Sequence, residues 1–201
     1  WFLTNMFAAI WSLGYLFMIS TNDHDAAYLS NVILHWAATF IPLFYFFFAL
    51  AITNTYVKYK KVFYLFSVIA IGLVIANLSK YYVTDVFPKF IFNFAPNAGP
   101  LYKYFTAYFF LVIIIAILII YKFLKTQIFQ DNADKLRIKY ILIASIFGFS
   151  GGGSVFFLTF NVQVPPYTLA LFSLYPVVIT YAILKHHLFN FRVIATEIFV
   201  F

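Results

Sequence analysis

The sequence predicts an all-α fold, a polytopic bundle of transmembrane helices. Of its 201 residues, 65% are hydrophobic, 24% are aromatic and only 9% are charged, whereas a soluble globular domain carries about 25% charged residues. Several apolar runs are long enough to cross a bilayer, which takes roughly 20 helical residues. So small a number of charged residues cannot cover a water-facing surface. The loops are also too short to hold a soluble domain. We therefore expect an integral membrane protein.

The apolar runs define six predicted spans in this chain. Each must be helical, because the bilayer offers no water to hydrogen-bond the backbone. The predicted spans are residues 1–19, 30–53, 62–78, 102–121, 138–160 and 167–185. Together they form a predicted transmembrane bundle over 1–194, while 195–201 begins a further apolar segment or a connector to an output domain.

The basic residues of the loops predict the orientation of the bundle. The loops 55–61 and 122–139 and the tail after 185 fall on one side, and their basic residues are Lys58, Lys60, Lys61, Lys122, Lys125, Lys135, Arg137, Lys139, Lys185 and Arg192. The other side keeps only Lys80, Lys89 and Lys103. By the positive-inside rule the C-terminus is cytoplasmic. The chain then enters from the cytoplasmic side, which leaves room for a seventh span before Trp1.

The net charge of +7 and the lack of cysteine exclude several classes of partner. The basic residues lie between apolar runs and not on one folded surface, so we expect the lipid bilayer as the partner and no nucleic acid. Without cysteine there is no disulfide framework, thiolate nucleophile or cysteine-based metal site.

The first outer loop reads Asn22-Asp23-His24-Asp25. Two carboxylates around a histidine suggest a metal site, but neighbouring residues on a short loop rarely converge on one ion. We expect an N-terminal helix cap here, and no metal.

Three polar or amphipathic residues near the outer ends of the second and third spans are candidate ligand contacts, namely His35, Trp36 and Asn77. A polar side chain at membrane depth tends to face the bundle interior, where it lines a binding pocket. The alternative is a tryptophan of the interface belt with a hydrogen-bonded histidine beside it. Pro42, in the second span, removes a backbone hydrogen bond and predicts a kink.

The outer segment 80–101 contains two β-prone runs, YYVTDV and KFIFNF, separated by Phe87-Pro88 and followed by the turn-rich APNAGP. It predicts a small extracytoplasmic hairpin-like loop over the mouth of the bundle. It is either a lid over a ligand site or a tight linker held by aromatic burial.

The fifth span holds the run GFSGGGS at 148–154. Ala144, Gly148 and Gly152 recur every four residues, which lets a neighbouring helix approach closely. Adjacent glycines also weaken a helix, so the run Gly151, Gly152 and Gly153 is either a packing contact or a hinge. Beyond it, Asn161 and Gln163 offer polar groups to a ligand.

The last span contains Pro176, with Ser173 and Thr180 nearby to satisfy freed carbonyls. This proline either makes a static kink in the packing or converts a rearrangement of the bundle into a tilt of the cytoplasmic end of the helix. Lys185, His186 and His187 follow the apolar run at once, as expected where a helix leaves the bilayer among anionic head groups.

Three stretches carry a resemblance to a known family. They are AIWSLGYLF at 9–17, NAGPLYKYF at 97–105 and LYPVVITYAILKHHLFNFRVI at 174–194. In this order they resemble the N-terminal seven-helix membrane region of bacterial sensor histidine kinases. The family often carries Asp where this chain has Asn190, and a second basic residue where it has His187.

The resemblance implies a sensory input domain in the bacterial inner membrane, feeding a histidine kinase or a related signalling output. It implies a homodimer, a downstream kinase domain with ATP and Mg²⁺, and a response regulator, with no cofactor in this segment. It makes Tyr181, Lys185, His186 and Arg192 the expected output residues. The phosphorylated histidine of such kinases lies in a separate domain, so His186 and His187 are not expected to carry phosphate.

No catalytic motif or intramembrane carboxylate marks this segment as an enzyme. The rival hypothesis is a fragment of a polytopic transporter or channel, for which we find no internal repeat and no charge within the spans. A purely structural anchor is the third hypothesis.

Overall fold

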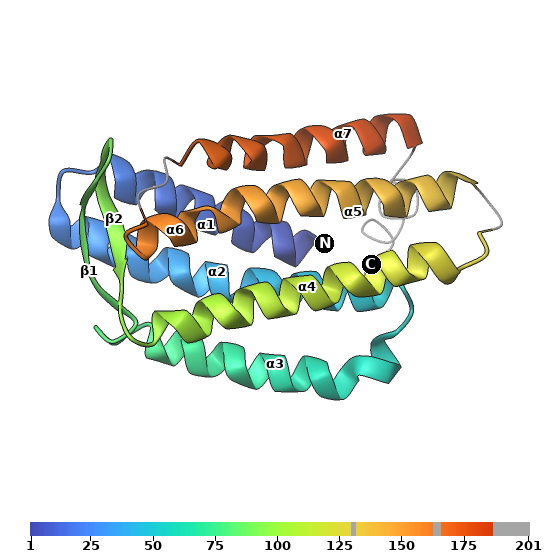
Figure 1. The fold of residues 1–201 in the computed structure, drawn as a ribbon, viewed down its shortest axis with the longest axis horizontal. Helices are drawn as coiled ribbons and strands as arrows, with labels where there is room; N and C mark the ends of the chain where they lie inside the picture. The colour runs from blue at the N-terminus through green and yellow to red at the C-terminus, as the bar shows by residue number, and fades with distance from the viewer. Residues whose placement is uncertain (130–131, 163–165, 187–201) are drawn as a thin grey trace, which may run out of the picture. The chain divides into compact units, whose positions relative to one another are not determined.

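The computed structural model of the chain describes residues 1–129, 132–162 and 166–186. Its helices and strands, coloured along the chain in Figure 1, are α1 (Phe2–Ser20), α2 (His24–Ile52), α3 (Tyr56–Ala76), β1 (Val83–Lys89), β2 (Phe92–Ala98), α4 (Tyr102–Thr126), α5 (Asn132–Gly153), α6 (Val155–Thr159), the 3₁₀ helix η1 (Pro166–Ser173) and α7 (Leu174–His186). Among the described residues, the helices long and apolar enough to cross a membrane are α1, α2, α3, α4 and the stretch Asn132–Thr159. The all-α polytopic fold is confirmed, and the number of spans stays a prediction.

The chain forms two compact units. Unit 1 comprises Trp1–Ile119 and Ser154–Pro166, and unit 2 comprises Ile120–Gly153 and the chain from Tyr167 onward. The divisions fall within α4, at the junction of α5 and α6, and at the start of η1.

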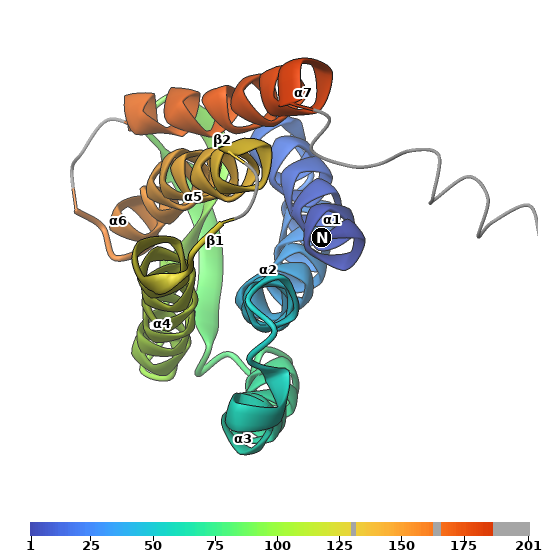
Figure 2. The same cartoon turned by 90° about the vertical axis from the view of Figure 1, so that its right-hand side faces the viewer.

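Within unit 1, α2 is the central helix, with α1 on one side and α3 on the other (Figure 2). The apolar window of α2 is 67% buried, against 17% in α1 and in α3. The outer helices leave large apolar side chains uncovered, such as Leu13 and Val68. Such side chains suit a bilayer, whose lipid tails are as apolar as they are.

A glycine brings α1 and α2 together. A Cβ at Gly14 would lie 2.9 Å from Cβ of Leu34, closer than side chains pack. The Ser30 hydroxyl donates to the Gly14 carbonyl over 2.8 Å, which adds a hydrogen bond to the close approach. Small residues at such crossings permit the backbone contact on which membrane helices depend.

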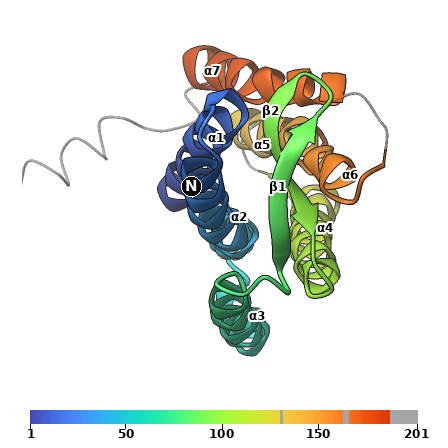
Figure 3. The ribbon, with the colours of Figure 1, turned by 90° about the vertical axis from the view of Figure 1, so that its left-hand side faces the viewer.

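Strands β1 and β2 form an antiparallel hairpin that lies across one end of the unit 1 helices (Figure 3). We call this the hairpin end. The predicted hairpin-like loop is confirmed, but Phe87 and Pro88 belong to β1, and the turn falls at Phe90 and Ile91. Pro88 sits at a register shift where the ladder needs no N–H, which is why a strand accepts it.

The C-terminal half of β2 also differs from the expectation. The segment APNA, predicted as a turn, pairs with β1 through Ala95, Pro96, Asn97 and Ala98. A two-stranded hairpin has only edge strands, so a proline costs few ladder bonds there.

In unit 2, the structure places two helical pieces where the sequence predicts one span over 167–185. The 3₁₀ helix η1 is followed by α7, and Pro176 is the third residue of α7. The N–H groups of the first helical turn have no partner within the helix, so proline is tolerated there. Pro176 therefore stands where the 3₁₀ helix gives way to the α-helix. Pro42, by contrast, lies buried well inside α2, which continues to Ile52.

Candidate functional site

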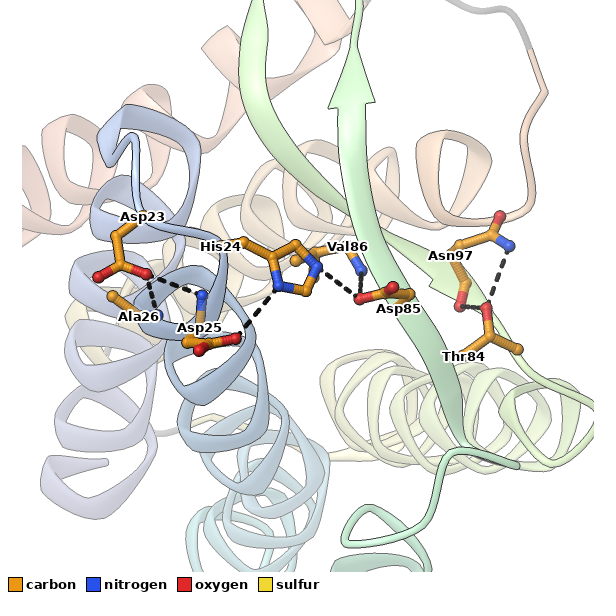
Figure 4. Close-up of polar contacts among 8 residues, drawn as sticks. All are labelled: Asp23, His24, Asp25, Ala26, Thr84, Asp85, Val86 and Asn97. Atoms are coloured by element: carbon orange, nitrogen blue, oxygen red, sulfur yellow. Dashed lines mark hydrogen bonds and ion pairs between the residues drawn. The ribbon is translucent and has the colours of Figure 1, made fainter.

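An imidazole links the hairpin to α2 at the hairpin end. His24, the first residue of α2, contacts the Asp85 carboxylate of β1 over 2.9 Å and its neighbour Asp25 over 3.4 Å (Figure 4). Beside it, the Asp23 carboxylate accepts from the backbone N–H groups of Asp25 and Ala26 and so caps α2. The predicted helix cap is confirmed. The contact across 61 residues to Asp85 could not be read from the loop sequence.

Asparagine side chains link the hairpin to the end of α1 and to the chain after α6. The Asn93 amide donates over 3.1 Å to the carbonyls of Ser20 and Thr21, where α1 ends. On β2, the Asn97 side chain accepts from the Asn161 amide. The hairpin is thus held by directional polar contacts to segments far apart in the sequence.

Lys89 joins the hairpin to α6. Its ammonium donates to the carbonyl of Pro96 over 2.8 Å and to that of Leu158 over 2.9 Å. Burial removes water from this ammonium and lowers the pKa of Lys89 from 10.5 to about 8.

Beneath the hairpin, His35 lies at the centre of a buried cluster. It is 3% exposed, and its ring packs edge-on against Tyr82, Tyr102 and Phe105. Nδ1 lies 2.8 Å from the Asn31 carbonyl oxygen and therefore donates to it. Nε2 of the neutral ring then accepts from the Tyr102 hydroxyl at 3.1 Å. These two bonds hold the ring in one orientation.

The cluster contains polar atoms that no described residue satisfies. Both side-chain amide atoms of Asn31, which is 1% exposed, lack a hydrogen-bond partner, as does the buried hydroxyl of Tyr15. Tyr15 belongs to α1, which packs against α2, and its ring meets Phe92 of β2 edge-on. A buried polar group without a partner costs about 1–3 kcal/mol. Asn31 and Tyr15 therefore give the cluster an unused capacity to bind a polar group.

Tyr82, in the chain before β1, lines the cluster on the hairpin side. It is fully buried, and burial followed by the neighbouring Tyr102 raises the pKa of its hydroxyl well above the usual value. The hydroxyl therefore stays protonated and keeps its ability to donate.

The three residues predicted near the outer ends of the second and third spans divide between interior and surface. His35 and Asn77 are buried, which confirms that they face the interior. The Asn77 amide donates to the Val32 carbonyl over 2.8 Å and joins the end of α3 to α2. Trp36 is 39% exposed, so part of its side chain lies at the surface. Their roles in binding a ligand stay predictions.

Of the two polar residues predicted beyond the glycine run, Asn161 is exposed and contacts the hairpin through Asn97. It has the left-handed backbone conformation that asparagine tolerates, with φ of 61°. Gln163 lies outside the described residues.

In unit 2, the glycine run faces η1 and α7. A Cβ at Gly151 would clash with the backbone nitrogen of Phe172, and one at Gly148 would meet the Tyr175 ring at 3.2 Å. Gly153 is also buried, while Gly152 is half-buried. The close contact therefore runs through Gly148 and Gly151, three residues apart.

The predicted hinge coincides with a division of the chain. Helix α5 continues through Gly151 and Gly152 to Gly153, and Ser154 separates it from α6. The boundary between the two units falls at the same point. A hinge role for these glycines, and for Pro42 and Pro176, stays a prediction.

Three of the four predicted output residues lie in the second half of α7. Tyr181 packs against Tyr140 of α5, with ring centroids 5.5 Å apart. Lys185 and His186 are the last two residues of α7, and Arg192 lies outside the described residues.

Sequence reasoning missed several members of the cluster. Tyr102 belongs to the motif NAGPLYKYF, so the sequence could have identified it. No motif or unusual neighbour distinguishes Tyr15, Asn31 and Tyr82 from the many similar residues of the chain. Within the described ranges, no group of three or more histidine and carboxylate side chains is placed to hold a metal ion.

Comparison with known proteins finds one family. A family model described as the N-terminal 7TM region of histidine kinase matches residues 1–192. No curated protein and no solved structure matches the chain.

Proposed function

The chain belongs to the family of N-terminal 7TM regions of histidine kinases, and from this we propose that it senses a stimulus at its hairpin end and passes it to a cytoplasmic kinase domain. The proposal places the hairpin end outside the cytoplasm and the end of α7 inside it. It also includes a homodimer in the bacterial inner membrane, and a response regulator as the recipient of phosphate. ATP and Mg²⁺ would bind only in the kinase domain.

The observation that carries this proposal is the buried cluster around His35. Polar groups inside a membrane bundle are costly and mark functional sites. Here Asn31 has unused hydrogen-bonding atoms one helical turn from a histidine that is already oriented by Tyr102. Tyr15 adds an unused hydroxyl on the neighbouring helix α1. A stimulus that gives these atoms partners would favour one arrangement of the bundle over another.

The size of the response follows from differential affinity. A ligand shifts an equilibrium between two arrangements only as far as it binds one better than the other. The Asn31 and Tyr15 atoms provide such a difference, because a partner that reaches them in one arrangement would lose those bonds in the other. The hairpin, tied to α1, α2 and α6, would move with whichever helices respond.

Kinase assays on neighbouring residues test the proposal. In the full-length protein in lipid nanodiscs, His35→Phe is expected to change basal autophosphorylation at least fivefold, the lower end of typical coupling between sites, about 1–3 kcal/mol. Ile33→Leu, at an exposed position of the same helix that belongs to no predicted site, is the control and should leave the rate unchanged. An unchanged rate in a His35→Phe protein with a normal melting transition contradicts the proposal.

Labelling tests the orientation separately. This region has no cysteine, so a single Lys80→Cys at the hairpin end and a single Lys122→Cys at the far end of α4 report on opposite sides. A maleimide that does not cross membranes should label only the first in intact cells. Labelling of Lys122→Cys alone would reverse the topology and remove the sensory proposal.

A further inference from the structure

A pocket of about 360 Å³ opens beside the hairpin turn, apart from the His35 cluster. It is lined by Lys89, Phe90, Leu158, Asn161 and Val162, all within unit 1. Its volume falls in the range of small-molecule sites, roughly 300–1,000 Å³.

The pocket holds a cation that lacks a counterion. Lys89 forms no ion pair with any described residue, and its two hydrogen bonds go to neutral carbonyls. Strand β2 and helix α6, which pack against it, carry no titratable side chain. The one acid on its own strand, Asp85, contacts His24. An ammonium has three N–H groups, so one remains for a ligand.

The rest of the lining is mostly apolar. The side chain of Phe90 is 54% exposed and that of Val162 is 45% exposed, so both present apolar surface at the pocket. Phe90 and Asn161 both have left-handed backbones, with φ of 53° and 61°. A left-handed phenylalanine is strained, because its Cβ lies too close to the following carbonyl oxygen. Strain of this kind gathers at ligand sites, and two of the three described non-glycine residues with a left-handed backbone border this pocket.

We propose that this pocket binds a small amphipathic anion, with a carboxylate or phosphate head on the Lys89 ammonium and an apolar body against Phe90 and Val162. The head would supply the missing counterion, and the body would cover the exposed apolar side chains. The inference deepens the proposed sensory function, on which its consequence for signalling rests. The binding itself does not depend on kinase activity.

Titration with short-chain probes tests the binding. Octanoate and octyl phosphate are added to the full-length protein in nanodiscs of zwitterionic lipid, with octanol as the uncharged probe, and heat of binding is measured. Both anions should bind saturably and at least about tenfold more tightly than octanol, because hydrogen bonds to charged groups are the stronger kind. Equal binding of octanoate and octanol would overturn the proposal.

Two substitutions separate the ligand role from the structural role of Lys89. Lys89→Gln should weaken octanoate binding at least about tenfold, while Lys80→Gln, on an exposed lysine at the same end, should not. Val162→Trp fills the pocket while keeping Lys89 in the sequence, and it should abolish binding while the melting transition stays normal. Octanoate binding that survives both Lys89→Gln and Val162→Trp would also overturn the proposal.

The pH dependence gives a second readout. Octanoate binding should weaken as the pH rises from 7 through the Lys89 pKa, and Lys89→Arg should bind equally at both ends of that range because arginine stays charged. Loss of binding at high pH in Lys89→Arg as well would place the titrating group elsewhere and contradict the assignment.

A competition experiment with anionic lipid identifies the source of the anion. If the natural occupant is a lipid head group, adding an anionic phospholipid to the nanodiscs should compete with octanoate at the wild-type pocket and not in Lys89→Gln. If it is a free small molecule, octanoate affinity should be unaffected by the anionic lipid. Both outcomes support an amphipathic anion on Lys89. If binding fails while His35→Phe still alters kinase activity, the pocket is refuted and the sensory function stands.

Discussion

The hairpin end of unit 1 and the contact of α5 with η1 and α7 in unit 2 are held together in different ways. In the first, side chains far apart in sequence meet through oriented hydrogen bonds, such as Tyr102 with His35. In the second, glycines let another backbone approach, as Gly151 does with Phe172. A hydrogen bond forms only between a particular donor and acceptor, whereas close packing depends on the shapes of the two surfaces. Polar recognition is therefore expected at the hairpin end, and adjustment of packing in unit 2.

The largest effect is expected from filling the unit 2 contact. Gly151→Leu places a Cβ against the backbone nitrogen of Phe172, which is unable to rotate away as a side chain would. Overpacking typically costs 1–3 kcal/mol and occasionally more, so we expect about 3 kcal/mol lower stability in denaturant unfolding. Gly72→Leu is the matched control, since no atom lies within 4 Å of its Cβ position. Replacing glycine by leucine improves helix propensity at both positions, so equal losses in the two variants would show that the close approach of Phe172 does not determine the loss.

A smaller effect is expected from removing one hydroxyl at the hairpin end. Tyr102→Phe keeps the ring contacts but leaves Nε2 of His35 buried without a donor, at about 1–3 kcal/mol. Tyr104→Phe, at an exposed position on the same helix, should change the unfolding free energy very little. If Tyr102→Phe is as stable as the control, the cluster is held by ring packing alone, and the contrast between the two regions disappears.

Replacing the unpartnered amide should act in the opposite direction. Asn31→Leu keeps the volume roughly constant and removes two buried polar atoms without partners, so we expect about 1 kcal/mol higher stability without added ligand. The melting temperature of the purified protein checks the sign. A loss of stability would reveal that the amide already has partners in the membrane, such as ordered water.

The smallest effect concerns Lys89 and pH. Its pKa is about 8 in the folded protein, against an ordinary value of 10.5, so between these values the unfolded chain binds more protons. Stability then rises with pH across this window. Lys89 is half-buried, so the rise is modest and is best measured as the difference between wild type and Lys89→Met in urea unfolding from pH 7.5 to 10.5. A wild-type curve parallel to that of Lys89→Met would show that the ammonium is as well solvated as a free lysine.

Much of the site was beyond sequence reasoning for a physical reason. His35 and Asn77 were predicted because a polar residue in an apolar run stands out and must find a partner. The tyrosines of the cluster did not stand out, because the chain has 16 of them and an exposed tyrosine suits the membrane interface as well as a buried one suits a core. Asp85 as the partner of His24 depended on where the hairpin turns, which was misplaced around Phe87 and Pro88.

The sequence by itself determined the solvent and the class of fold, because 65% hydrophobic residues in long runs force the backbone into helices within a bilayer. It also placed a hairpin-like segment between the third and fourth long helices. Only the tertiary structure decided which polar groups meet: His35 with Tyr102, His24 with Asp85, and Lys89 with the carbonyl of Leu158. Apolar patterning is local and repeats along the chain, whereas a hydrogen bond between distant residues exists only once the helices have packed.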